Sequence, residues 1–156
     1  MREVKLEGSV AEYSGDSFEE ISSMFSSDLD RIEDEILFLG FTEKDVFAVR
    51  LCCDELFTNA YKHGNDKDPR IGIRFEYKIL GRNFPLDLMV YGFSGSIRDN
   101  GNGFDPNKIR NPLLDENIDI PNGRGILLVE SYSDFVEFRK DDGFTVSFMR
   151  YKQKGL

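Results

Sequence analysis

The sequence is poor in the residues that metal centres and disulfide frameworks need. Its 156 residues include one histidine and two cysteines, Cys52 and Cys53, which are neighbours in the chain. Neighbouring cysteines on a helix point in different directions and rarely pair. So few histidines and cysteines also argue against a zinc site. We therefore expect two buried free thiols in a reducing compartment.

Long apolar runs and an excess of basic charge are missing as well. No stretch approaches the roughly 18 apolar residues of a membrane span, and the N-terminal segment has no apolar core of a signal peptide. A net charge of −9 offers no basic surface to the phosphates of a nucleic acid. These absences predict a soluble cytoplasmic protein that binds neither a membrane nor nucleic acid directly.

Several motifs of phosphate binding and hydrolysis are also absent. There is no P-loop motif, and no glycine pair extends to G-x-G-x-x-G. The segment Gly92–Ser96 lacks the final glycine of a nucleophile elbow. Because His63 is the only histidine, a Ser-His-Asp hydrolase is not supported, and we expect His63 to cap the end of a helix.

The sequence does contain enough apolar material for one core. Hydrophobic residues make up 40% of it and aromatic residues 13%, which is too apolar for a disordered chain. The length fits one compact domain, and no repeat, linker or low-complexity tract divides it. We therefore predict a single domain over residues 1–156.

Two helices follow an N-terminal strand in the predicted order of elements. Residues 2–12 alternate loosely, which predicts a strand with Val10 on its apolar side. A capping-box spacing at Ser17 and a terminating Gly40 bound a helix whose apolar residues recur every three or four positions. A second helix is predicted from Thr42 to about His63.

The rest of the chain predicts two hairpins with a loop and a helix between them. Residues 70–80 alternate strictly from Ile71 onward, and their hairpin partner leads into Asp99, although glycines at 92 and 95 suggest a bulge. Residues 100–122 form an unusually long loop, a helix starts at Gly123, and a hairpin ends the chain. This order predicts an α+β fold, a two-layer α/β sandwich with helices over a mixed, mostly antiparallel sheet.

Two polar residues of the second helix stand beside its apolar stripe. Glu55 and Asn59 are four residues apart and therefore share one helix face. On their own they also fit a solvated helix edge or a helix-to-loop hydrogen bond, and Asp54, about 100° around the helix, would face solvent. In the chemical interpretation Asn59 supplies an amide oxygen to magnesium, which usually keeps waters and substrate phosphates as its other ligands. Glu55 then accepts a proton from an attacking hydroxyl.

Two glycine-rich turns complete the candidate constellation. Asp99, Gly101 and Gly103 follow a strand and fit an ordinary turn. Alternatively, the Asp99 carboxylate accepts a hydrogen bond from the amine of a flat base such as adenine, and the glycines let the base come close to the backbone. Gly123, Arg124 and Gly125 open a helix whose free amides favour phosphate. Arg124 either reaches that phosphate or is simply exposed.

Three segments together resemble a known superfamily. The segments are DELFTNAYKHG, DNGNGFDP and GRGILLVES, which are similar to the N, G1 and G2 boxes of the GHKL, or Bergerat-fold, ATPases with their histidine-kinase-like ATPase domain. Within that superfamily the short chain and the NAxxHG ending resemble the bacterial anti-sigma-factor serine/threonine kinases. The resemblance spans about residues 15–150.

The resemblance implies roles for the candidate residues. Glu55 would be the general base, and Asn59 would bind the magnesium of a bound ATP. Asp99 would bind the adenine amine, and Gly101 and Gly103 would shape the base pocket. Three residues would form the phosphate-binding end of an ATP lid over residues 104–122: Gly123, Arg124 and Gly125. The implied partners are a sigma factor, an anti-sigma-factor antagonist and a second copy in a homodimer.

The sequence leaves the activity open between three interpretations. The first is a kinase that phosphorylates the antagonist, which the presence of Glu55 favours because a pure binder needs no base there. The second is a non-catalytic module that uses ATP to control its binding of partner proteins. The third, a histidine-kinase catalytic domain, would require a separate phosphoacceptor helix pair, for which 156 residues leave no room.

Overall fold

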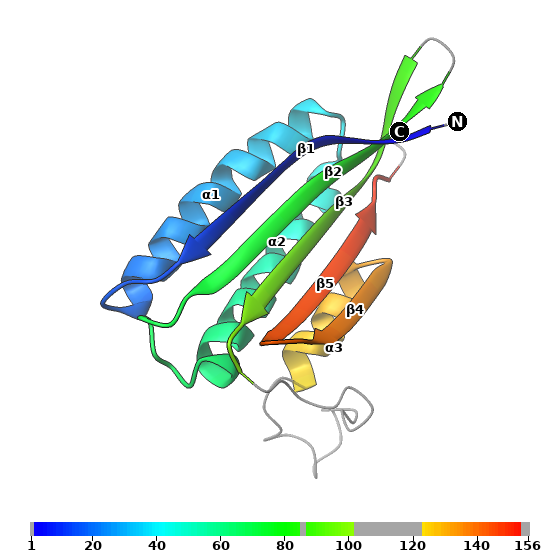
Figure 1. Cartoon of the computed structure of the whole chain (residues 1–156). Helices are drawn as coiled ribbons and strands as arrows, with labels where there is room; N and C mark the ends of the chain where they lie inside the picture. The colour runs from blue at the N-terminus through cyan, green and yellow to red at the C-terminus, as the bar shows by residue number, and fades with distance from the viewer. Residues whose placement is uncertain (1, 85–86, 102–122, 154–156) are drawn as a thin grey trace.

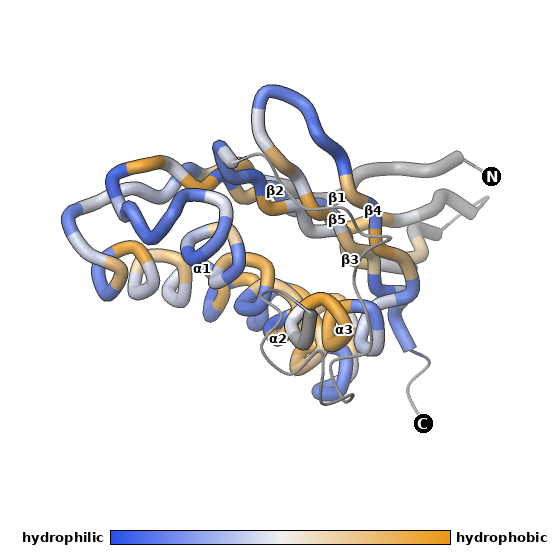
Figure 2. The backbone as a smooth tube through the Cα atoms, turned by 90° about the horizontal axis from the view of Figure 1, so that it is seen from below, coloured by the Kyte–Doolittle hydropathy of each residue, from blue (hydrophilic) through white to orange (hydrophobic). Residues whose placement is uncertain are grey.

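The computed structural model describes residues 2–84, 87–101 and 123–153, which form two layers (Figure 1). One layer is a sheet in the order β1-β2-β3-β5-β4, and the helices cover one of its faces (Figure 2). The predicted α+β sandwich is confirmed, and each described strand pair is antiparallel. The strands are β1 (Arg2–Tyr13), β2 (Ile73–Phe84), β3 (Asp87–Asp99), β4 (Phe135–Lys140) and β5 (Phe144–Tyr151). The helices are α1 (Phe18–Phe38), α2 (Glu43–Asn59), its π-helical continuation η1 (Ala60–Gly64), and α3 (Gly123–Tyr132).

Helix α1 begins and ends at the predicted residues. The Ser17 hydroxyl accepts a hydrogen bond from the Glu20 N–H at 3.1 Å, while the Glu20 carboxylate accepts from Asp16. Gly40 has a φ of +91°, and the Phe41 N–H donates to Ile36, which is the Schellman pattern of a helix C-terminus. The predicted apolar face is buried at every third or fourth position: Ile21, Phe25, Leu29, Ile32 and Ile36.

Helix α2 is the central helix of its layer, with contacts to both α1 and α3 (Figure 1). The helix starts after Thr42, as predicted, and Thr42 forms a complete capping box with Asp45. Because neighbours cover it on several sides, its buried surface is wider than the predicted stripe and includes Cys52 and Phe57. Both cysteines are buried and free, as expected. None of the helices in the described ranges is long and apolar enough to cross a membrane.

Aromatic side chains fill the space between the layers. Phe25 of α1 stacks on Phe57 of α2, with ring centroids 4.2 Å apart, and meets Phe75 of β2 edge to face at 5.2 Å. Each fully buried side chain of this kind contributes about 1.5–3 kcal/mol to folding. This packing joins both long helices to the centre of the sheet.

Two apolar residues that were predicted on the apolar side of a strand do not face the core. Val10 is 50% exposed, because Ala11 and Tyr13 are the residues of β1 that face the helices. The pairing of β1 with β2 has a register shift between Lys5 and Glu7. Ile71 precedes β2, which begins at Ile73, and is 37% exposed.

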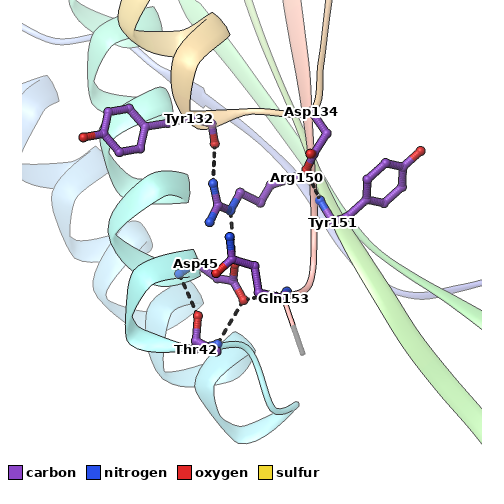
Figure 3. A network of polar contacts seen from close by, with 7 residues as sticks. All are labelled: Thr42, Asp45, Tyr132, Asp134, Arg150, Tyr151 and Gln153. Atoms are coloured by element: carbon purple, nitrogen blue, oxygen red, sulfur yellow. Dashed lines mark hydrogen bonds and ion pairs between the residues drawn. The ribbon is translucent and has the colours of Figure 1, made fainter. Parts of the chain in front are cut away.

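A buried ion pair fixes the end of α3 against the start of α2 (Figure 3). The Arg150 Nε of β5 donates to the Asp45 carboxylate at 3.1 Å, and its Nη1 donates to the Tyr132 carbonyl at 2.9 Å. The second Asp45 oxygen accepts from the backbone N–H groups of Thr42 and Gln153. Asp45 is fully buried and Arg150 is 8% exposed. The network therefore holds α2, α3 and the segment after β5 in one arrangement.

Candidate functional site

Helices α2 and α3 lie side by side and run in opposite directions. Gly125, in the first turn of α3, lies against Glu55 and Asn59 near the end of α2. At the other end, Tyr132 meets Phe47 with ring centroids 5.7 Å apart. A Cβ atom built on Gly125 would lie 2.8 Å from Glu55 Oε2 and 3.0 Å from Asn59 Nδ2. The three predicted residues are therefore brought together, and a residue larger than glycine at position 125 would collide with both polar side chains.

Asn59 carries a buried polar group without a partner. Its Nδ2 atom is inaccessible to solvent and has no hydrogen-bond partner within the part of the chain that the structure describes. An unpaired buried donor costs about 1–3 kcal/mol, and such groups in native proteins often belong to functional sites. The Asn59 amide therefore has a donor that the described residues leave unused.

Asp99 and two glycines form a second close approach at the end of β3. Asp99 is 7% exposed, and its Oδ1 accepts a hydrogen bond from the Gly101 N–H at 2.7 Å. A Cβ atom on Gly64 would lie 2.1 Å from the Asp99 carboxyl, and one on Gly101 would lie 2.4 Å from the Gly64 carbonyl oxygen. Burial raises the pKa of Asp99, and the hydrogen bond from Gly101 partly offsets this.

Asn65 holds this second group in place, which the sequence did not reveal. It follows η1 and is 2% exposed. Its side-chain oxygen accepts from the Asn100 N–H at 3.0 Å, and its amide donates to the carbonyls of Ile71 and Gly72. Its own N–H donates to Ala60, five residues back, which closes the π-helical turn. One side chain thus ties the end of η1 to the end of β3 and the start of β2.

A pocket connects the two groups. It extends from Asn59 on α2 to Asp99 on β3, and apolar side chains from both layers form much of its wall. His63 borders this pocket, and no capping hydrogen bond from its ring is seen among the described residues, contrary to expectation. Burial and the nearby Lys62 and Lys67 lower the pKa of His63. The apolar lining residues are Leu56, Ala60, Ile97, Ile126, Phe144 and Val146.

Other predicted site residues are placed in part or not at all. Gly123 and Arg124 open α3, directly before Gly125. Gly103 and the predicted lid, residues 104–122, lie outside the described residues. Gly143, in the turn between β4 and β5, was not predicted, although a Cβ atom there would lie 2.2 Å from the Asp99 carbonyl oxygen. Its place in an ordinary Asp-Gly turn gave no sign of this contact.

The described residues do not assemble a metal site by themselves. They contain no group of three histidine, cysteine, aspartate or glutamate side chains able to hold a metal ion. Magnesium commonly takes only one or two protein ligands and completes its shell with waters and substrate phosphates. The single amide of Asn59 beside an open pocket fits that pattern.

Comparisons with known proteins agree with this geometry. The family model described as histidine kinase-like ATPase domain matches residues 32–150. The chain is similar to proteins named serine-protein kinase RsbW from Staphylococcus aureus strains JH9 and Newman. Each is 29% identical over 121 residues, which is 74% of this chain and 71% of the relative. The matched region contains α2, the end of β3, α3 and the pocket between them, and the chain belongs to the family of histidine kinase-like ATPase domains.

Proposed function

We propose that this protein is an ATP-dependent serine/threonine kinase that acts as an anti-sigma factor and phosphorylates an anti-sigma-factor antagonist. The observation that supports this most is the single pocket that joins Asp99 to Asn59, with Glu55 beside it. The relatives named serine-protein kinase RsbW support the reaction type. The proposed partners are a sigma factor, the antagonist and a second copy of the chain, in the cytoplasm.

The end of the pocket near β3 suits the adenine base. Its apolar walls can cover the two faces of a flat ring, and the Asp99 carboxylate can accept a hydrogen bond from the exocyclic amine. Gly64 and Gly101 have no side chains to keep a base away from this carboxylate. Gly103 and the lid are proposed to complete the pocket.

The end of the pocket near α2 and α3 suits the phosphates. Magnesium, when bound, would neutralise charge on the phosphate oxygens. The Asn59 amide oxygen is the proposed protein ligand, and the backbone amides of Gly123, Arg124 and Gly125 would face the phosphates at the start of α3.

Glu55 is proposed as the general base of the transfer. The serine or threonine oxygen of the antagonist forms a bond to the γ-phosphorus as the bond to the ADP oxygen breaks. The hydroxyl proton passes to the Glu55 carboxylate, which Gly125 leaves uncovered. General base catalysis of this kind contributes roughly 10²–10⁴-fold to the rate.

Substitutions at two neighbouring carboxylates, Glu55 and Asp54, test the proposal. Glu55→Gln should lower the transfer of labelled phosphate to the antagonist by at least about 100-fold, while ADP still raises the melting temperature. Asp54→Asn is the matched control, because Asp54 is exposed and pairs with Arg50 at 3.4 Å on the side of α1. If Glu55→Gln transfers phosphate at the parent rate, Glu55 is not the base. If the parent protein binds ADP but transfers nothing, it is a non-catalytic ATP-binding module.

A further inference from the structure

Arginine side chains form a row across the face of the sheet that lies opposite the described helices. Arg74 of β2 lies directly opposite Arg98 of β3, and Arg98 lies opposite Thr145 of β5. Thr145 in turn lies opposite Arg139 of the edge strand β4. The inward-facing neighbours Phe75 and Ile97 are buried in the core. The arginine row, Arg74, Arg98 and Arg139, therefore points away from the helices and the candidate nucleotide pocket.

These side chains surround a hollow on the open face. With Glu76, Ser96 and Thr145 they line a space of about 240 Å³. Glu76 is the only carboxylate among the lining residues, against three guanidinium groups. The hollow is thus locally positive, although the chain as a whole carries a net charge of −9.

The nearby carboxylates leave most of this charge unneutralised. Glu76 lies 3.8 Å from Lys78, and Arg139 lies 3.9 Å from Asp141, both near the limit of an ion pair. Glu12 of β1 lies directly opposite Arg74 of β2. Within the described part of the chain, no ion pair of Arg74 or Arg98 is seen. The guanidiniums of Arg74 and Arg98 are therefore free to bind an anionic group.

The row is unfavourable for folding when considered alone. Side chains directly opposite each other in an antiparallel pair have Cβ atoms only about 4.5–5.5 Å apart, and like charges at such positions destabilise the pair. An anionic partner would relieve this repulsion, because the planar guanidinium binds carboxylates with two parallel hydrogen bonds. The hydroxyl of Thr145, which lies between Arg98 and Arg139, offers a further donor, whereas the Ser96 hydroxyl is bonded to Ser147 at 2.7 Å.

We propose that the arginine row binds an acidic segment of a partner protein. The charges on this face favour a short carboxylate-bearing segment over an extended polyanion. Glu12 and Glu76 border the row, and Glu137 follows on β4 next to Ser147, so the positive region is only one row of residues deep. The phosphates of a nucleic acid or an anionic membrane would be repelled by these acidic residues and by the overall charge of −9. The proposal does not depend on the nucleotide pocket, which lies on the other face.

Binding of a defined peptide to the full-length chain tests the proposal. The probe is a fluorescent 15-residue peptide of alternating Glu and Ser, and a Gln-for-Glu peptide is the neutral control. Arg74→Gln and Arg98→Gln should each weaken binding about tenfold, since one charge-assisted contact is lost. The double variant should abolish binding. Arg31→Gln, on α1 with a side chain that is 64% exposed, removes the same charge from the helical layer and should bind like the parent.

Three outcomes of the binding and sedimentation measurements would overturn the proposal. The first is a parent protein that does not distinguish the acidic from the neutral peptide. The second is a double variant that binds the acidic peptide as the parent does. The third is a double variant that sediments as a monomer where the parent is a dimer, because the row would then belong to a contact between copies of the chain.

Thermal melting of the same variants separates binding from folding. Arg98→Gln removes a like-charge repulsion with Arg74, so it should melt at the parent temperature or above it. Arg74→Gln removes the same repulsion together with the attraction to Glu12 opposite it, so it should melt near the parent temperature. Lost peptide binding with unchanged or higher stability supports a binding role. A clear fall in melting temperature would instead show that the arginines support the sheet, and the proposal would fail.

Discussion

Gly125 approaches Glu55 so closely that a Cβ atom on the glycine would lie 2.8 Å from the Glu55 carboxylate. Real Cβ atoms almost never come so near another heavy atom, so any side chain at position 125 must displace Glu55. The nearest groups are the ends of the Glu55 and Asn59 side chains, the residues assigned to proton transfer and magnesium binding. Close packing of α3 on α2 is therefore linked directly to the arrangement of the proposed active site.

Gly125→Ala should impair nucleotide binding without unfolding the protein. Alanine favours a helix over glycine by about 0.8–1.0 kcal/mol, which offsets part of the cost of moving the two side chains. We expect ADP affinity to fall at least about tenfold, measured by titration calorimetry, with little change in melting temperature. Glu130→Ala, at an exposed position of the same helix, is the control. Parent-like affinity in Gly125→Ala would show that the displaced side chains do not contact the nucleotide.

Local chemistry explains why much of the fold was predictable. Ser17, Gly40 and Thr42 act within a few residues of their own positions, so their capping roles could be predicted and are confirmed. Gly101 could be predicted to allow a close approach to the backbone, because it occurs together with Asp99 after a strand. The pocket that joins them to Asn59 follows from the fold.

Features that depend on distant partners could not be predicted. Asn65 bonds to Asn100, 35 residues away, and an asparagine after a helix is an ordinary turn residue. The orientation of Val10 was wrong because alternation shows which residues share a face, whereas pairing and register shifts decide which face is buried. Ile71 continues the alternating pattern in the sequence. In the structure it belongs to the turn that Asn65 stabilises, which ends just before β2.

The raised pKa of Asp99 predicts a pH-dependent effect on stability. Because burial raises the folded pKa, the ionised carboxylate destabilises the fold at neutral pH, and this cost disappears as the pH falls below the ordinary value of about 3.9. Asp99→Asn should therefore melt higher than the parent at pH 7, and the difference should shrink as the solution is acidified. Asn can still accept the hydrogen bond from Gly101. A difference that grows toward low pH would contradict this assignment.

The same variant should lose most of its response to nucleotide. A ligand at 100 times its dissociation constant stabilises a fold by about 2.7 kcal/mol. We expect ADP to give the parent protein a shift of this size and Asp99→Asn a much smaller one. With the amide oxygen accepting from the Gly101 N–H, the NH₂ group of the new side chain would face the amine of the base, and two donors would meet. An equal shift in both proteins would exclude Asp99 from base recognition.

Asn65 should matter for both stability and nucleotide binding. Asn65→Ala leaves the Asn100 N–H and the carbonyls of Ile71 and Gly72 without this partner, so we expect a loss of about 2–4 kcal/mol in urea denaturation. ADP affinity should fall too, because Asp99 and Gly101 adjoin Asn100. Asn100→Ala removes only an exposed side-chain bond to Gly72 and should cost less than about 1 kcal/mol. Equal losses in the two variants would mean that the Asn65 contacts do not hold β3 in place.

The buried pair of Arg150 and Asp45 gives the largest expected loss of stability. Arg150→Met leaves the fully buried Asp45 carboxylate without its counter-charge, which typically costs about 3–5 kcal/mol. Adding Asp45→Asn removes that charge while an amide oxygen can still accept from Thr42, so the double variant should be more stable than Arg150→Met alone. Urea denaturation of the parent, both single variants and the double variant gives the coupling energy. A coupling energy near zero would show that the two groups contribute independently to stability.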